Sequence, residues 1–128
     1  MSTKAKTPKK VKAYYEIPVK LTKNHNVIPD IPTTLKLGKT VHYYSKEGNV
    51  NNTDEVKIDF HDGSPYEYPS GRQKKKVTSN ELLTLKRTGN FIGQCSITKD
   101  GVTYGWGATY GSNTKGGDPA GGNHNVQP

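Results

Sequence analysis

The stretch Gly89-Asn-Phe-Ile-Gly-Gln-Cys-Ser-Ile97 decides the fold class of this chain. Phe91, Gly93 and Cys95 occupy every second position in it, and Ile97 continues their spacing. Successive side chains of a β-strand point to opposite faces, so this spacing places the four residues on one face. We therefore predict a strand that buries this face, with Cys95 as a small residue of the core.

Short runs with the same alternation occur throughout residues 13–110. Their apolar positions fall within residues 15–21, 35–37, 41–43, 56–60, 83–85 and 102–106. Turn-forming residues bound each run, and Asp62-Gly63 and Asp100-Gly101 have the composition of hairpin turns. The best helical candidate, Thr78–Leu83, resembles a capping box but is too short for a stable helix. These runs predict an all-β sandwich of two sheets.

The two ends differ in composition from this body. Residues 1–12 hold five lysines and no acidic residue, and they carry most of the net charge of +8. Residues 111–128 are rich in glycine and asparagine and have few side chains that could be buried. Since neither end can offset the entropy lost on ordering, we expect a disordered basic arm at 1–12 and a disordered tail at 111–128. Residues 13–110 then form one domain.

Length and composition exclude several classes of protein. The 128 residues contain no run of about 18 apolar residues, so we expect no membrane span. The start lacks the apolar segment of a signal peptide, which favours a cytoplasmic location. A single cysteine rules out a disulfide scaffold. The sequence has no phosphate-binding loop, zinc-ligand spacing or Gly-x-Ser-x-Gly turn, and we predict no catalytic residues and no enzyme activity.

The residues Gly89-Asn-Phe-Ile-Gly-Gln-Cys95 resemble a strand of the cupredoxins, the family of plastocyanin and azurin. Cupredoxins carry Gly-x-Tyr/Phe-x-x-x-Cys on the strand that delivers the copper cysteine. Residues 38–43, 56–60 and 69–71 are similar to the preceding strands and loop of that family. The resemblance covers residues 35–106 and implies a cupredoxin-like, two-sheet Greek-key sandwich within residues 13–110.

The copper ligands of that family are mostly missing. A blue-copper site needs two histidines and a cysteine thiolate, usually with a methionine. Of these ligands, only Cys95 is present at a matching position. Asp54-Glu55 stand where the first histidine is expected, and residues 96–104 contain neither the second histidine nor the methionine. The departure implies a scaffold without copper, and we expect no metal and no cofactor.

Two segments of this scaffold are candidates for binding a ligand. The loop at 62–76 ends in a run of basic residues, Arg72, Lys74, Lys75 and Lys76. Loops on a rigid scaffold carry function more often than its strands do. The second segment presents three aromatic residues at alternate or nearby positions, Tyr104, Trp106 and Tyr110. On a strand, these rings either form a stacking surface for a sugar or base, or face the other sheet as core residues.

These observations predict a non-catalytic binding or accessory module that is monomeric and takes a protein or glycan ligand. The first alternative is a nucleic-acid-binding protein that uses the arm at 1–12 and the loop from Arg72 to Lys76, with binding that falls steeply as salt rises. The second alternative is a copper-binding electron-transfer protein.

Overall fold

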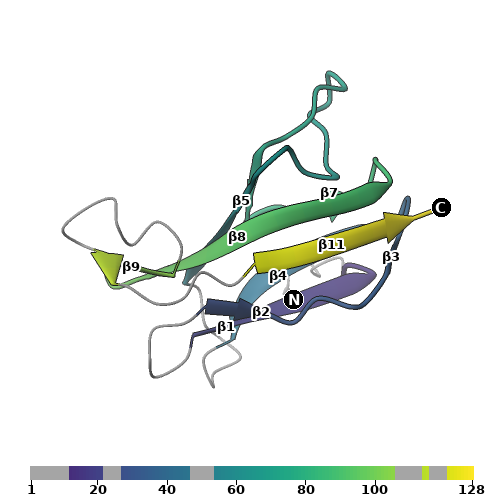
Figure 1. The fold of residues 1–128 in the computed structure, drawn as a ribbon. Coiled ribbons are helices and arrows are strands. Elements are labelled where there is room, and N and C mark those ends of the chain that lie inside the picture. The colour runs from purple at the N-terminus through teal and green to yellow at the C-terminus, as the bar shows by residue number, and fades with distance from the viewer. Residues whose placement is uncertain (1–11, 22–26, 47–53, 106–113, 116–120) are drawn as a thin grey trace, which may run out of the picture.

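The computed structural model describes residues 12–21, 27–46, 54–105, 114–115 and 121–128. These residues form strands joined by turns and loops, without a helix (Figure 1). The strands are β1 (Tyr15–Leu21), β2 (Val27–Pro29), β3 (Leu35–Lys36), β4 (Thr40–Lys46), β5 (Glu55–Phe60), β6 (Lys76–Thr78), β7 (Leu83–Thr84), β8 (Gly89–Lys99), β9 (Val102–Gly105), β10 (Thr114–Lys115) and β11 (Gly121–Gln127). Over the described ranges, no helix is long and apolar enough to cross a membrane.

The strands form two sheets, and each sheet contains both parallel and antiparallel pairs. The smaller sheet has the order β2-β1-β4-β7, with β1 parallel to β4. In the larger sheet, one edge of the long strand β8 pairs with β5, which also pairs with β6. The other edge of β8 pairs with β11 along its first half and with β9 along its second half. Strands β3 and β10 lie beside β11 and β9.

The two sheets enclose one apolar core, which their alternating inner faces supply. Its buried members are Ile17, Val19, Val27, Leu35, Val41, Tyr43, Val56, Ile58, Phe60, Tyr66, Val77, Leu83, Leu85, Cys95, Ile97 and Val126. Cys95 is fully buried, as its alternation with Phe91 predicts. The expected all-β fold is thus confirmed as two mixed sheets packed on a shared core.

Of the two predicted hairpin turns, one forms and the other does not. Asp100 and Gly101 both have positive φ, 52° and 78°, and they join β8 to β9 as the predicted two-residue hairpin. Asp62-Gly63 does not close a hairpin, because the chain continues through residues 64–75 before it returns as β6. The capping-box segment forms a turn in which the Glu81 carboxylate accepts a hydrogen bond from the Thr78 N–H at 2.9 Å.

The segment predicted to be a disordered tail supplies a strand of the larger sheet. Residues 121–127 form β11, which pairs with β8 on one edge and with β3 on the other. His124 and Val126 are buried, whereas Asn123 between Gly122 and His124 in the same strand is exposed. A Cβ atom at Gly122 would lie 2.7 Å from Ile31, so glycine permits this close packing. The prediction of disorder is wrong here because ladder bonds to distant strands offset the cost of ordering. The predicted arm lies outside the described residues except for Lys12.

Candidate functional site

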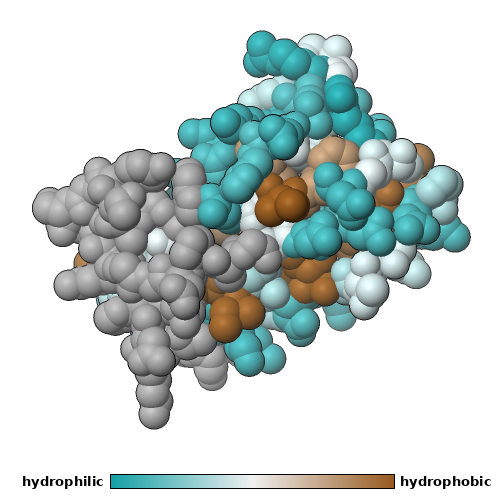
Figure 2. Space-filling view, in the orientation of Figure 1, coloured by the Kyte–Doolittle hydropathy of each residue, from teal (hydrophilic) through white to brown (hydrophobic). Residues whose placement is uncertain are grey.

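The loop between β5 and β6 projects from the end of the larger sheet (Figure 1). Its two arms pair at Glu67 and Gln73, and the Tyr68 N–H donates to the Arg72 carbonyl at 2.8 Å. The Gln73 side-chain amide also donates to the Ser64 carbonyl at 2.9 Å, which ties the second arm to the first. Figure 2 shows that hydrophilic residues cover most of this projection. The loop is therefore a hydrogen-bonded polar structure rather than a loose connection.

A pocket of about 390 Å³ lies between this loop and β7. Its lining consists of Tyr66, Glu67, Tyr68, Pro69, Gly71, Lys74, Leu82, Leu83, Thr84 and Lys86. Two apolar side chains of the lining are exposed to solvent, Tyr68 at 42% and Leu82 at 52% of their full accessible area. The pocket thus combines apolar surface with basic groups, so it suits a ligand that has both apolar and acidic groups.

Cations gather around the Tyr68 ring at the mouth of the pocket. The Arg72 guanidinium carbon and the Lys74 Nζ each lie 5.2 Å from the centroid of this ring. Lys74 also forms an ion pair with Glu81 at 2.5 Å. The exposed Lys86 side chain has no ion-pair partner within the described residues. Lys86 is therefore available to an anionic group entering the pocket.

One acidic residue of the lining is already neutralised. The Glu67 carboxylate accepts a hydrogen bond from Nε of Arg87 at 2.9 Å, and the same guanidinium reaches the Gly71 carbonyl. Ion pairs that remain in contact with solvent, as this half-buried pair does, add little to stability. The pair holds Glu67 against Arg87 and lowers its repulsion of an anionic ligand.

Tyr66 joins the pocket to a chain of hydrogen bonds in the core. Its hydroxyl lies 2.5 Å from the Tyr43 hydroxyl, which lies 2.8 Å from Nε2 of His124. Nδ1 of His124 lies 3.0 Å from the Gly122 carbonyl. Phe60 packs edge-on against the imidazole, with ring centroids 5.0 Å apart. The chain links the loop, the smaller sheet and the larger sheet through side chains that are almost fully buried.

The Gly122 carbonyl determines which group donates and which accepts in each of these hydrogen bonds. A carbonyl only accepts, so Nδ1 of neutral His124 carries the proton and Nε2 accepts from the Tyr43 hydroxyl. The Tyr43 oxygen then accepts from the Tyr66 hydroxyl. Burial lowers the pKa of His124 to about 4, against smaller opposing effects of the Gly122 and Phe91 carbonyls, and this keeps the ring neutral. Burial also raises the pKa of both tyrosines, so the chain carries no charge at neutral pH.

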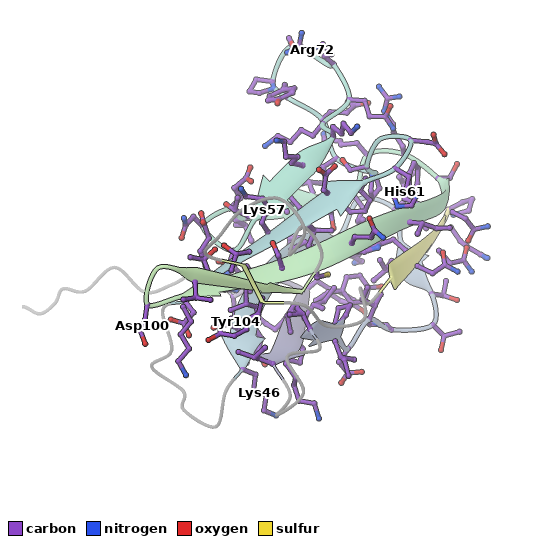
Figure 3. The ribbon with its side chains drawn as sticks, turned by 60° about the vertical axis from the view of Figure 1, so that its left-hand side comes forward. Lys46, Lys57, His61, Arg72, Asp100 and Tyr104 are labelled. Carbon is purple, nitrogen blue, oxygen red and sulfur yellow. The ribbon has the colours of Figure 1, made fainter. Side chains whose placement is uncertain are left out.

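The structure separates the two predicted binding segments. Lys74 lines the pocket and Arg72 lies over the ring of its lining residue Tyr68, while the exposed Lys75 and Lys76 lie outside the lining. Tyr104 of β9 packs partly against the core, and Figure 3 shows it well apart from Arg72. Trp106 and Tyr110 lie outside the described residues.

The thiol of Cys95 and the described histidines His42 and His124 do not fit a copper site. Burial raises the pKa of the Cys95 thiol to about 12, so it is protonated rather than a thiolate. Both ring nitrogens of His124 are already engaged by Tyr43 and Gly122. Nδ1 of His42 pairs with Glu16 at 2.9 Å. In the part of the chain that the structure describes, no three His, Cys, Asp or Glu side chains gather as a metal site.

Sequence reasoning missed several residues of these sites. Leu82 and Lys86 line the pocket beside the loop, and His124 is buried at the centre of the molecule. The spacing of His124 and Val126 two residues apart is a short alternating signal of a strand, but no local pattern relates Lys86 to the loop. Comparisons with protein-family models, curated proteins and solved structures find no match for this chain.

Proposed function

We propose that this chain is a non-catalytic binding module, which holds an acidic segment of a partner protein in the pocket between the 61–75 loop and β7. The observation that carries the proposal is the pocket itself, where exposed Leu82 and Tyr68 lie beside Lys86, whose ammonium has no ion-pair partner among the described residues. In this proposal, the scaffold is a cupredoxin-like Greek-key sandwich without copper, and the protein acts as a monomer. Strands β1 and β4 pair in parallel in a sheet that packs against a second sheet, and this arrangement supports such a scaffold.

The charge around the pocket favours an anionic partner. Residues 66–76 and 81–87 contain six basic side chains, Arg72, Lys74, Lys75, Lys76, Lys86 and Arg87, and two acidic ones, Glu67 and Glu81. Both carboxylates are held in ion pairs with residues of this same set. The surface therefore keeps a net positive field, which attracts an acidic ligand and speeds its association.

The chemistry of the lining favours binding over catalysis. The described lining contains no histidine, cysteine or serine, and its single carboxylate, Glu67, is tied to Arg87. Proton transfer or nucleophilic attack requires a poised base or nucleophile, which these side chains do not supply. Rigid aromatic and apolar surface with a few charges is typical of an interface.

The pocket favours a protein segment over a nucleic acid. Nucleic-acid affinity comes mainly from cations that are available to phosphates. Here Lys74 and Arg87 are held by Glu81 and Glu67, which leaves fewer cations available to a phosphate backbone. Leu82 instead offers apolar contact to a side chain of a peptide.

The proposal is tested by titrating the protein with three probes and following backbone amide NMR shifts. The probes are a capped hexapeptide of alternating glutamate and leucine, a single-stranded oligonucleotide and a sulfated oligosaccharide. The hexapeptide is expected to shift the amides of Leu82, Thr84 and Lys86. Lys86→Glu is expected to weaken its binding about fivefold, since it reverses one exposed charge at the pocket.

The matched control is Lys46→Glu, which reverses an equally exposed charge at the far end of β4. Figure 3 shows Lys46 and Arg72 at opposite ends of the molecule. This control is expected to leave the affinity within about twofold of the unaltered protein, since screening limits effects over such a separation. Pocket shifts with the oligonucleotide or oligosaccharide alone would overturn the peptide assignment. The absence of pocket shifts with all three probes would overturn the binding function.

A further inference from the structure

The outer edge of β7 is an unpaired strand edge that opens into the pocket. On its inner side, β7 pairs with β4 through the register Thr40 with Thr84 and Val41 with Leu83. The smaller sheet ends at β7, so no described strand pairs with its other edge. Exposed edges of this kind present unpaired N–H and C=O groups that can pair with another chain.

The hydrogen bonds on either side of Thr84 fix where its backbone points. The Leu85 N–H donates to the Lys39 carbonyl at 3.0 Å, on the side of β4. The Lys86 N–H donates to the Pro65 carbonyl at 2.8 Å, on the opposite side. Backbone groups of successive residues in a strand point in alternate directions, so Thr84 points the same way as Lys86. Its N–H and C=O therefore face the pocket, and no partner for them occurs among the described residues.

The loop and β7 form the two walls of a wedge. The bond between Lys86 and Pro65 joins the two walls at one end, and the rest of the loop projects from the end of the larger sheet (Figure 1). Tyr66 and Tyr68 lie on the loop wall, while Leu82 and Thr84 lie on the strand wall. An extended segment fits such a wedge because its backbone can pair with β7 while alternate side chains reach the loop.

We infer that the acidic partner segment binds as an added β-strand, antiparallel or parallel to β7, with its backbone paired to the N–H and C=O of Thr84. This inference rests on the proposed function and specifies how the pocket holds its ligand. Leu82 and Tyr68 contact the apolar side chains of the segment, and Lys86 pairs with an acidic one. Backbone pairing supplies affinity in such complexes, and the alternate side-chain contacts supply specificity.

The inference is tested with the same hexapeptide carrying N-methyl groups at either its even or its odd positions. In an added strand, only one of these two sets of N–H groups points toward β7. One methylated peptide is therefore expected to bind about tenfold more weakly, while the other binds within about twofold of the parent. Because this change is made in the peptide, the protein fold is unaffected.

Two substitutions of the protein test the same bond from the other side. Thr84→Pro removes the N–H that faces the pocket, and it spares the bonds to β4, which come from Leu83 and Leu85. Thr84→Val removes the hydroxyl and keeps the N–H. Binding is expected to weaken about tenfold with Thr84→Pro and to stay within about twofold with Thr84→Val.

The outcomes separate this inference from the proposed function. Equal sensitivity to both methylated peptides, together with weaker binding to Lys86→Glu, would overturn strand addition and leave the binding module standing. Failure of the hexapeptide to shift any pocket amide of the unaltered protein would overturn both. A loss of binding with one methylated peptide and with Thr84→Pro, but not with Thr84→Val, is the result expected for an added strand.

Discussion

The molecule contains two polar clusters that meet at Tyr66 but differ in their surroundings. In the core, Tyr66, Tyr43 and His124 form an uncharged chain of hydrogen bonds, in which both tyrosine hydroxyls and both ring nitrogens have a partner. At the pocket, Arg72 and Lys74 surround the exposed Tyr68 ring, and their charges remain in contact with water. Tyrosine therefore serves as a structural hydrogen-bonding group in one cluster and as an open contact surface in the other.

This difference indicates which polar residues stabilise the fold and which are free to contact a ligand. A buried polar group that loses its partner carries the full penalty of its lost hydration, so the core cluster tolerates little change. Ion pairs that remain in contact with solvent contribute between about 0 and 1 kcal/mol, so we expect changes to the half-buried pairs at the pocket to have little effect on folding. We expect substitutions in the core cluster to change stability and those at the pocket to change binding.

The largest effect is expected from His124→Ala. This change leaves a cavity in the core and deprives the Tyr43 hydroxyl of its acceptor, and together these effects lower the free energy of unfolding by about 4 kcal/mol. Urea denaturation measures it. The control is Asn123→Ala, which alters an exposed residue of the same strand and is expected to cost less than about 0.5 kcal/mol. Equal losses for the two variants would contradict the role of the buried chain.

A somewhat smaller effect is expected when His124 is protonated. Its pKa is about 4 in the folded protein and about 6.5 when exposed, so between these values the unfolded chain binds more protons. The free energy of unfolding therefore falls as the pH falls from 6.5 to 4, by about 3 kcal/mol in total, and this stability is fully present above pH 6.5.

Urea denaturation at a series of pH values measures this dependence. His124→Gln provides the control, because an amide can donate and accept hydrogen bonds but does not titrate. The variant is expected to lose most of the slope between pH 4 and 6.5. An unchanged slope would show that other groups cause the acid sensitivity.

The smallest effect on stability is expected from Glu67→Gln at the pocket. This change breaks the half-buried ion pair with Arg87, which remains in contact with solvent, and alters the free energy of unfolding by less than about 1 kcal/mol. It also removes a negative charge from the lining, so the glutamate–leucine hexapeptide is expected to bind about two- to threefold more tightly. Denaturation and fluorescence anisotropy measure the two quantities. A large loss of stability with no change in affinity would reverse the contrast between the clusters.

Much of the strand pattern could be predicted from the sequence because each strand carries its own signal. Val56, Ile58 and Phe60 alternate with polar residues, and Phe91, Gly93 and Cys95 do the same, so local spacing identifies the buried face. The Asp100-Gly101 turn is equally local, since both residues tolerate positive φ. These features depend on neighbours in the sequence and need no knowledge of the tertiary fold.

The features that the sequence did not reveal depend on distant contacts. The segment 121–127 has the composition of a disordered tail, yet its ladder bonds to β8 and the bond from Tyr43 to His124 give it a place in the sheet. The pocket likewise lies between segments that are joined by a bond from the Lys86 N–H to the carbonyl of Pro65, 21 residues earlier in the chain. Composition predicts how much a segment can bury by itself, but not which partners the fold will bring to it.

The position of β11 has a consequence for how the chain folds. Tyr43 and His124 are 81 residues apart, and β11 inserts between β8 and β3. Proteins dominated by such non-local pairings fold slowly, over about milliseconds to seconds, because the entropy of closing the loops is lost before the contacts form. Until β11 is in place, β3 and part of β8 have open edges and the Tyr43 hydroxyl lacks its acceptor. A chain in which β11 has not yet paired therefore exposes these open edges to aggregation.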